Sequence, residues 1–451
     1  MHYLNLPSNN VDLLRLHQQQ PNRYPYLLES VADGGSLSRY NILFAFPQDS
    51  LVLRNNELSY AGKPIAEDSF LDALDRLWQT EKPQPVASPP ADLPFQCGWF
   101  VYLGYELAAQ IESRLQLPMA MDSLPTAFAS RIPAAIIEDK HTQQIYLLAE
   151  DKTLLPLLQQ DYLQAMDANS VDDPAISIEL EEEAPERHFG VVEQAKQYIL
   201  DGDIFQANLS RLWCGKLKQS VSASTLYQSL REHNPAPFAG LVEFDGVSII
   251  SSSPERLVEV RGNLVQTRPI AGTRPRHSSE EDHRVTTELL AHPKERAEHI
   301  MLIDLERNDL GRISRPGSVH VDELMVLESY SHVHHIVSNV RGALRDGISP
   351  GQIIAAVFPG GTITGCPKVR CMEIIAELEN EGRGAYTGSM GYLNHNGDMD
   401  LNILIRTLVK HNDSIRLRAG GGIVIDSDAE NELNETRAKA RGLLRALGVK
   451  L

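Results

Sequence analysis

Short apolar runs and longer amphipathic stretches alternate along the chain of 451 residues. The apolar runs are rich in aromatic and β-branched side chains, which is typical of β-strands. They lie at 40–46, 97–105, 134–139, 144–150, 239–244, 247–252 and 256–260. The stretches 186–205 and 278–305 instead repeat apolar residues about every three to four positions, which predicts amphipathic helices.

This mixture predicts an α+β protein in which helices pack outside a large, mostly antiparallel β-sheet. A Rossmann unit is not expected, because no GxGxxG segment lies between a strand pattern and a helix pattern. The proline-rich segment 81–96 is predicted to be a loop, and the acidic segment 167–187 a solvated connector or a sheet edge.

The charge of the chain narrows the classes of ligand. The sequence holds 60 acidic and 42 basic residues, a formal net charge of −18. This excess argues against nucleic acid but leaves room for a small anionic substrate held by a few cations. The four cysteines lack a metal-like spacing and predict reduced thiols in a cytoplasmic protein. We expect no membrane segment, because neither a signal peptide nor an apolar stretch of about 20 residues is present.

Two pairs of glutamates are spaced three residues apart on predicted helices. Glu295 and Glu298 share one helix face, and Glu432 and Glu435 share another, with Lys439 on the same side. Carboxylate oxygens are the ligands that Mg²⁺ prefers, so the pairs form a candidate cage for this ion. The other interpretation is two solvated helix faces, since glutamate is common in helices.

The C-terminal glutamate pair lies in a helix whose opposite side is apolar. Ser427 and Glu430 fit the spacing of a capping box at the start of this helix. The predicted buried stripe consists of Leu433, Ala440, Leu443, Leu444 and Leu447.

The segment "SHVHHIVS" holds His332, His334 and His335. In a strand, the first two would lie on one face and His335 on the other. No cysteine or acidic ligand follows at a zinc spacing. We therefore interpret one histidine as an acid–base group and the others as structural or surface residues.

Two glycine-rich segments, "FPGGTITGCPK" and "RAGGGIVIDS", are further candidates. Neither is a Walker loop, because Pro367 stands where that motif needs its glycine–lysine pair. The glycines at 420–422 either bind a carboxylate through backbone N–H groups or form a tight turn between strands. With Arg406 and Lys439 as cations, the residues favour a Mg²⁺-assisted enzyme acting on a small polycarboxylate. A non-catalytic ligand-binding subunit with a similar cleft is the alternative.

The ordered motifs of the chain resemble those of one enzyme family. They run from "YPYLLES" at 24–30 through "SSSPERL", "TRPIAGTRPR", "YSHVHHIVS" and "AGGGIVIDSD" to "ETRAKARGLL" at 435–444. This set is similar to the chorismate-utilising enzymes: anthranilate synthase and aminodeoxychorismate synthase component I, with their isochorismate and salicylate synthase relatives. The resemblance implies a single large chorismate-binding fold, α+β, with antiparallel sheets sandwiched together and helices outside. It divides the chain into an N-terminal region at 1–165 like that of anthranilate synthase component I, an acidic connector at 166–187 and a chorismate-binding catalytic region at 188–451.

By matching motif position, the resemblance implies roles for the candidate residues. Those implied to hold Mg²⁺ are Glu298 and Glu435, with Glu295 and Glu432 nearby. Those implied to hold the ring carboxylate of chorismate, besides the metal, are Gly420, Gly421, Gly422 and Lys439. Those implied to hold the enolpyruvyl carboxylate are Tyr386 and Arg406. The implied general acid for the departing 4-hydroxyl is His335, and the implied contact of that hydroxyl region is Thr362.

The nucleophile follows from the motif "GDIFQANL". Relatives that add water to chorismate carry a lysine in this motif and use it as a base, whereas this chain has Gln206. A neutral amide does not deprotonate water usefully at neutral pH. The resemblance therefore implies ammonia, supplied by a glutamine amidotransferase partner (component II), because no cysteine of this chain lies in the nucleophile turn of a fused glutaminase.

The motifs disagree about which carbon of chorismate is aminated. Many aminodeoxychorismate synthases carry a lysine, thought to attack C2, where this chain has Ala271 before the substrate-binding Gly272 and Thr273. Anthranilate synthases have alanine there. The segments "GDIFQANLS", "NPAPFAGLVEF" and "PGGTITG" instead resemble aminodeoxychorismate synthases. We expect 4-amino-4-deoxychorismate, a precursor of p-aminobenzoate and folate, with anthranilate as the alternative product.

The segment "LLES" at 27–30 resembles the tryptophan-feedback motif of anthranilate synthases. The resemblance places Ser30, Pro237 and Phe238 in the lining of a tryptophan pocket. In the other interpretation, Ser30 caps a turn and Phe238 belongs to the core.

Overall fold

The fold is described from a computed structural model for residues 1–9, 11–32, 38–81, 93–167, 175–275, 293–329 and 333–450. For residues 271–275, 293–295, 329, 333 and 334 the description is limited to the backbone. Most of the loop predicted at 81–96 and the first half of the helix predicted at 278–305 lie outside the described residues.

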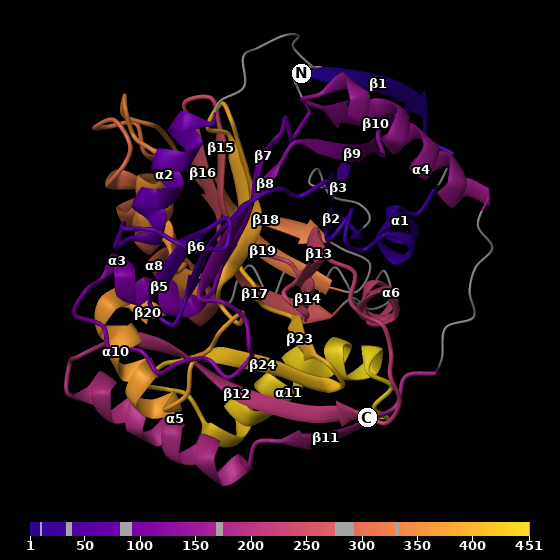
Figure 1. Ribbon diagram of the computed structural model, residues 1–451. Coiled ribbons are helices and arrows are strands. Elements are labelled where there is room, and N and C mark those ends of the chain that lie inside the picture. Colours follow the sequence, from indigo (N-terminus) through magenta and orange to yellow (C-terminus); the bar gives the residue numbers. More distant parts are fainter. Residues whose placement is uncertain are drawn as a thin grey trace.

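One of two large antiparallel sheets combines strands from both ends of the chain (Figure 1). Its strands are β1 (His2–Pro7), β2 (Tyr26–Glu29), β3 (Tyr40–Ala45), β9 (Ala134–Asp139), β10 (Gln144–Ala149), β11 (Ile178–Glu182), β12 (Gln206–Leu217), β13 (Phe238–Phe244), β14 (Val247–Ser253), β20 (Gly365–Cys366), β23 (Thr407–His411) and β24 (Ser414–Ile423). They follow the order β1-β10-β9-β3-β2-β13-β14-β23-β24-β12-β11, and β20 also pairs with β12.

The second sheet is built in the same way. Its strands are β4 (Ser50–Arg54), β5 (Glu57–Tyr60), β6 (Lys63–Pro64), β7 (Gly98–Leu103), β8 (Ala127–Ile132), β15 (Arg256–Arg261), β16 (Leu264–Arg268), β17 (Ile270–Pro275), β18 (His320–Ser329), β19 (Val333–Ala343), β21 (Ser389–Asn394) and β22 (Met399–Asn402). They follow the order β17-β19-β16-β15-β22-β21-β7-β8-β4-β5-β6, and β18 also pairs with β19.

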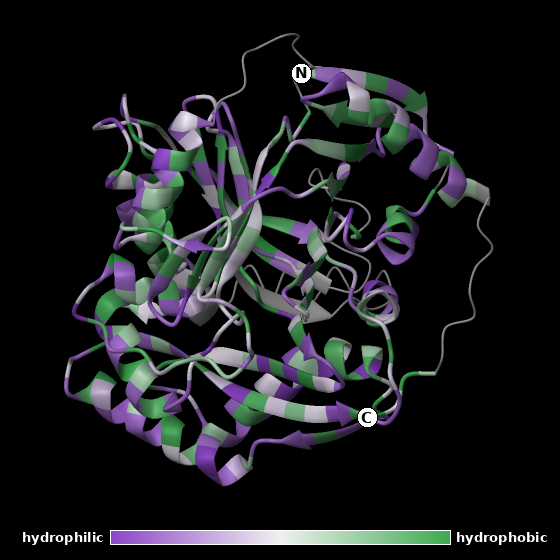
Figure 2. Cartoon of the chain, viewed as in Figure 1, coloured by the Kyte–Doolittle hydropathy of each residue, from purple (hydrophilic) through white to green (hydrophobic). Residues whose placement is uncertain are grey.

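Helices cover the outer faces of the sheets (Figure 1). They are α1 (Leu13–Gln19), α2 (Phe70–Thr80), α3 (Ala108–Ile111), α4 (Leu155–Asp167), α5 (Pro185–Leu200), α6 (Ala223–His233), α8 (Pro293–Gly311), α9 (Pro350–Val357), α10 (Lys368–Glu379) and α11 (Ala429–Ala446), with short 3₁₀ turns η1 (Tyr105–Leu107), η2 (Lys152–Leu154) and η3 (Gly361–Ile363). Figure 2 shows mixed hydrophilic and hydrophobic positions along these outer helices, as their amphipathic patterns predict.

Aromatic side chains join the two sheets face to face. Tyr26 and Phe44 come from the first sheet, and Phe100 and Phe128 from the second. The rings of Tyr26 and Phe100 stack at 4.3 Å, while Phe44 meets Phe100 edge-on at 5.3 Å. All four rings are buried, and burial of such large apolar areas stabilises the sandwich.

The structure confirms the predicted α+β class, with antiparallel sheets packed together and helices outside. The strands expected from the apolar runs are present, and α5 ends at Leu200, before the stretch predicted to be helical ends. Part of the acidic segment forms the edge strand β11. The division at residues 165 and 187 stays a prediction. No helix in the described parts of the chain is both long and apolar enough to cross a membrane.

Candidate active site

The glycine run Gly420–Gly422 lies inside β24 and pairs with β12, so the interpretation of this run as a tight turn is wrong. On its other edge β24 pairs with β23 only between Ser414 and Leu417. Within the described chain, the run is therefore bonded to a strand along one edge alone. Backbone groups on the second edge are open to other partners, and Lys439 Nζ donates to the carbonyl of Gly420 at 2.9 Å.

The missing side chains of this run let polar groups approach both faces of β24. A Cβ on Gly420 would lie 2.7 Å from the Tyr386 hydroxyl oxygen, and a Cβ on Gly422 would lie 2.0 Å from Nε2 of Gln206. A Cβ on Gly421 would point to the other face, 3.3 Å from carboxylate oxygens of α11. Any larger residue would displace these predicted site residues, so glycine is required for close approach.

The carboxylates that meet Gly421 belong to Glu432 and Glu435. Glu432 accepts a hydrogen bond of 2.7 Å from Oγ of Ser427, and Glu435 forms an ion pair of 2.7 Å with Lys439. The predicted capping box is wrong, because Asp428 caps α11 by accepting from Asn431 N. Ser427 instead orients Glu432. The predicted apolar stripe of α11 is buried as expected.

These two carboxylates fit a hard divalent cation, because their oxygens converge on a position where β24 has no side chain. The described residues contain no cluster of three or more metal-ligating side chains. Glu298 is half-buried on α8, which packs against β17 and β19. The side chain of Glu295 lies outside the described residues.

Arg406 and Tyr386 form the opposite side of the site. Arg406 adopts φ 53° just before β23. Burial lowers the pKa of its guanidinium, while the nearby Tyr386, Glu435 and Glu255 favour its charge. No carboxylate of the described residues forms an ion pair with Arg406, which leaves this cation available to an anionic ligand. Burial raises the pKa of Tyr386 to about 12, so its hydroxyl keeps its proton at neutral pH.

Glu255, between β14 and β15, is a site residue that the sequence interpretation missed. Burial raises the pKa of its carboxyl to about 7. The Thr362 hydroxyl, the Ile270 backbone and the charges of Lys439 and Arg406 oppose this rise. Thr362 faces Glu255 without reaching hydrogen-bond geometry, and its buried hydroxyl has no other partner among the described residues. The motif "SSSPERL" contained the signal, since it places an acidic residue between two apolar strands.

The remaining candidates lie on β17 and β19. Ala271 pairs with Ile336 and Thr273 with His335, with a bulge between them that includes Gly272. His335 is buried. The side chains at 271–273 and of His334, and all of His332, lie outside the described residues. Ala271 directly follows Ile270, whose backbone lowers the pKa of the Glu255 carboxyl. Strand β17 therefore borders the site.

A family model described as chorismate binding enzyme matches residues 24–445. The chain belongs to the family of chorismate-binding enzymes. It is 45% identical over 362 residues to an anthranilate synthase component I-like protein of Synechocystis sp., covering 79% of this chain and 74% of the relative. It is 43% identical over 369 residues to aminodeoxychorismate synthase component 1 of Bacillus subtilis, covering 78% and 77%. Anthranilate synthase component I from Streptococcus pneumoniae has a similar structure, with a TM-score of 0.81, 32% identity and coverage of 91% and 93%.

Apart from the candidate chorismate site, this chorismate-binding enzyme has a cavity of about 430 Å³ between its sheets, termed the second cavity. Ser30, Pro237 and Phe238 all line it. Arg256 lies 5.0 Å from the Phe238 ring and pairs with Asp400 at 2.8 Å. Further apolar lining comes from Leu28, Ile42 and Met390. The cavity therefore presents both apolar surface and charge.

Replacing Glu255 by glutamine should stabilise the protein, and more so as the pH rises. The folded pKa of about 7 is raised above the ordinary value of 4.5, so the folded wild type loses stability as pH rises between these values. We expect the gain in melting temperature of Glu255→Gln over wild type to grow up to about pH 7 and then level off. Glu57→Gln, at an exposed position, is the matched control. A gain in melting temperature that does not change with pH would contradict the raised pKa of Glu255.

Proposed function

We propose that this chorismate-binding enzyme aminates chorismate with ammonia and releases 4-amino-4-deoxychorismate, for p-aminobenzoate and folate biosynthesis. The observation that carries amination is Gln206, whose amide lies against the glycine run. An amide is no base for water, whereas ammonia is a nucleophile without deprotonation. Addition of water to chorismate is therefore disfavoured at this site.

The two carboxylates of chorismate match two sets of cations and donors. Arg406 and Tyr386 are proposed to hold the enolpyruvyl carboxylate, because the guanidinium has no ion pair with a described carboxylate and the phenol keeps its proton. The open edge of β24 and Lys439 are proposed to hold the ring carboxylate. Chorismate would then lie along β24, with its ring between these two ends.

The acidic side of the site is proposed to hold Mg²⁺ through Glu432 and Glu435, with Glu298 and Glu295 of α8. When bound, the ion would offset the charge of the ring carboxylate and draw electrons from the ring. Ser427 and Lys439 orient the two carboxylates of α11. Without a cation, the ring carboxylate would meet two like charges.

Departure of the 4-hydroxyl requires a proton. His335 is proposed as the general acid, as the family resemblance implies, with Thr362 contacting the hydroxyl. Glu255 is a second proton source, because its pKa of about 7 keeps a substantial fraction protonated at neutral pH. Its position next to Thr362 supports a role at this end of the ring.

Ammonia is proposed to come from a glutamine amidotransferase subunit. The similar proteins are named as component I or component 1, and such a name implies a second component. The cytoplasm is the proposed location, and it rests on the four cysteines, which are all unpaired in the structure.

Anthranilate formation is the second candidate function. It is favoured by Ala271, which removes the lysine that would attack C2, and by similar proteins of both names. Amination at C4 is supported by the "QANL", "APFAGL" and "GGTITG" segments. Without the lysine, either a second nucleophile such as water or ammonia serves at C2, or ammonia attacks C4 directly.

Product identity decides between the two reactions. We expect the purified chain, given chorismate, ammonia and Mg²⁺, to form a product that becomes p-aminobenzoate only after a lyase is added. Chromatography with and without the lyase is the measurement. Anthranilate fluorescence without the lyase would exclude the C4 proposal.

Loss of one acidic ligand should weaken the dependence on Mg²⁺ selectively. We expect Glu435→Gln to raise the Mg²⁺ concentration for half-maximal rate by at least about tenfold. Glu430→Gln is the matched control, because Glu430 is exposed in the first turn of the same helix. Calorimetric titration with Mg²⁺ measures the same change without turnover. Equal titrations for both variants would refute the metal assignment.

The second cavity is proposed to bind tryptophan, since an indole ring needs apolar walls and an amino-acid zwitterion needs both signs of charge. We expect tryptophan to raise the melting temperature of wild type but not of Phe238→Ser. Phe205→Ser controls for loss of an aromatic ring, because Phe205 is 70% exposed and does not line this cavity. If tryptophan does not shift the melting temperature of wild type, the alternative that Phe238 belongs to the core is supported.

A further inference from the structure

Arg383, between α10 and β21, is a fully buried arginine whose guanidinium contacts three separate segments. It donates to the carboxylate of Glu379 at 2.9 Å and 2.6 Å. It also donates to the carbonyl of Ile363 at 3.2 Å and to the carbonyl of Asn208 at 2.6 Å. A charged fork that satisfies several buried acceptors at once fixes their spacing.

Two of the three contacted segments carry a residue of the proposed chorismate site. Ile363 follows Thr362 in η3, and Asn208 lies two positions after Gln206 in β12. The centre of the guanidinium also lies 5.5 Å from the ring centre of Tyr386. Arg383 therefore contacts the segments that carry Thr362 and Gln206, and its guanidinium lies close to the ring of Tyr386.

The backbone around Arg383 is held as well. Arg383 N donates to Glu106 at 2.7 Å, and Ala385 N donates to Asp122 at 3.0 Å. Gly384 adopts φ 59°, and a Cβ there would lie 1.9 Å from Oδ2 of Asp122. The turn that leads into Tyr386 is thus bound to two carboxylates from other parts of the chain.

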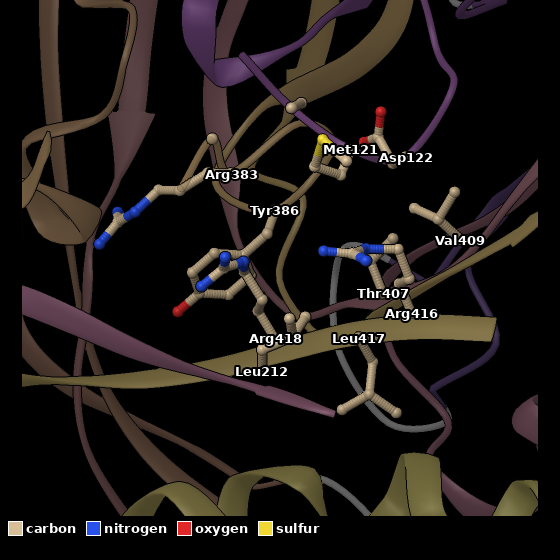
Figure 3. Close-up of a pocket in the computed structure, with 12 residues that line it drawn as sticks. Met121, Asp122, Leu212, Arg383, Tyr386, Thr407, Val409, Arg416, Leu417 and Arg418 are labelled. Carbon is tan, nitrogen blue, oxygen red and sulfur yellow. The ribbon is translucent and has the colours of Figure 1, made fainter. Parts of the chain in front are cut away.

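A small cavity leaves one part of the Tyr386 side chain without packing contacts. A cavity of about 30 Å³ adjoins its side chain, and Figure 3 shows Arg383, Tyr386 and Arg418 together in the lining. Within the described residues, no hydrogen bond holds the Tyr386 hydroxyl. A space of this size leaves part of the ring without packed neighbours, so the contact with the guanidinium contributes to its orientation.

We propose that Arg383 is a positioning residue that sets the orientation of Tyr386 and its spacing from Thr362 and Gln206. The proposal rests on the proposed placement of the enolpyruvyl carboxylate at Tyr386. The competing explanation is purely structural: Arg383 would serve only to neutralise the buried Glu379, as removal of one partner of a buried ion pair is strongly destabilising.

Charge neutralisation and positioning are separable by mutation. Arg383→Met leaves Glu379 buried without this partner and should unfold at lower temperature. Adding Glu379→Gln removes the charge while keeping an oxygen for Ser210 N and Oγ, which both bond to Glu379. We expect the double variant to regain most of the melting temperature, but its kcat/KM for chorismate to stay about 10- to 100-fold below wild type.

Two further variants show whether Arg383 acts through Tyr386. Arg383→Lys keeps the charge but not the fork, so we expect a melting temperature between those of wild type and Arg383→Met, with a raised KM and a lowered kcat. When Arg383→Lys is combined with Tyr386→Phe, the fold-loss in kcat/KM should be smaller than the product of the two single fold-losses. Arg416→Met is the matched control, because Arg416 lines the same cavity and pairs with Glu381. We expect it to leave kcat/KM within about twofold of wild type.

The rates are measured as chorismate consumption, so they do not depend on which carbon is aminated. Recovery of activity together with stability in the Arg383→Met, Glu379→Gln variant would overturn the proposal, as would fully independent losses in the Arg383→Lys, Tyr386→Phe pair. If wild type consumes no chorismate, the proposed function fails on its own. The same variants are then compared by dissociation constant for chorismate, and an unchanged constant for Arg383→Lys would overturn the positioning role.

Discussion

The antiparallel pairing of β12 with β24 is the constraint on which the candidate site depends. Its register sets Asn208 opposite Gly422 and Ser210 opposite Gly420, over ten consecutive pairs. β23 ends its pairing with β24 before the glycines begin. Among the described strands, the run is thus paired along one edge and unpaired along the other, and it carries no side chain on either face. A ligand carboxylate can approach backbone groups there, while α11 brings acidic groups to one face and Gln206 and Tyr386 reach the other.

Charge balance explains how an acidic protein accommodates a substrate with two carboxylates. Lys439 is shared between the carboxylate of Glu435 and the carbonyl of Gly420. Arg406 is the second cation, and burial strengthens its attraction for any anion that enters. These local cations outweigh the distant excess of surface acid, because solvent and salt screen exposed charges beyond about 10 Å.

Sequence periodicity predicted α11, its buried stripe and the common face of Glu432 and Glu435, since these follow from helix geometry alone. It did not predict that Ser427 would serve Glu432 while Asp428 caps the helix, because both residues are good caps and tertiary contacts decide between them. The glycine run was compatible with a turn or a strand until its pairing with β12 was known. No sequence pattern indicated the role of Arg383, since its acceptors at Asn208 and Ile363 are backbone carbonyls far apart in sequence.

Glu255 and Ala271 are linked through the first residue of β17, Ile270. The backbone of Ile270 acts on the Glu255 carboxyl, and position 271 is the next residue along β17. An ammonium group beside a buried carboxyl favours the ionised form and lowers its pKa. Alanine at 271 brings no such charge, which agrees with a Glu255 whose pKa stays near 7. Alanine at 271 also offers no nucleophile, so the proposed proton-donor role of Glu255 does not depend on the side chain at that position.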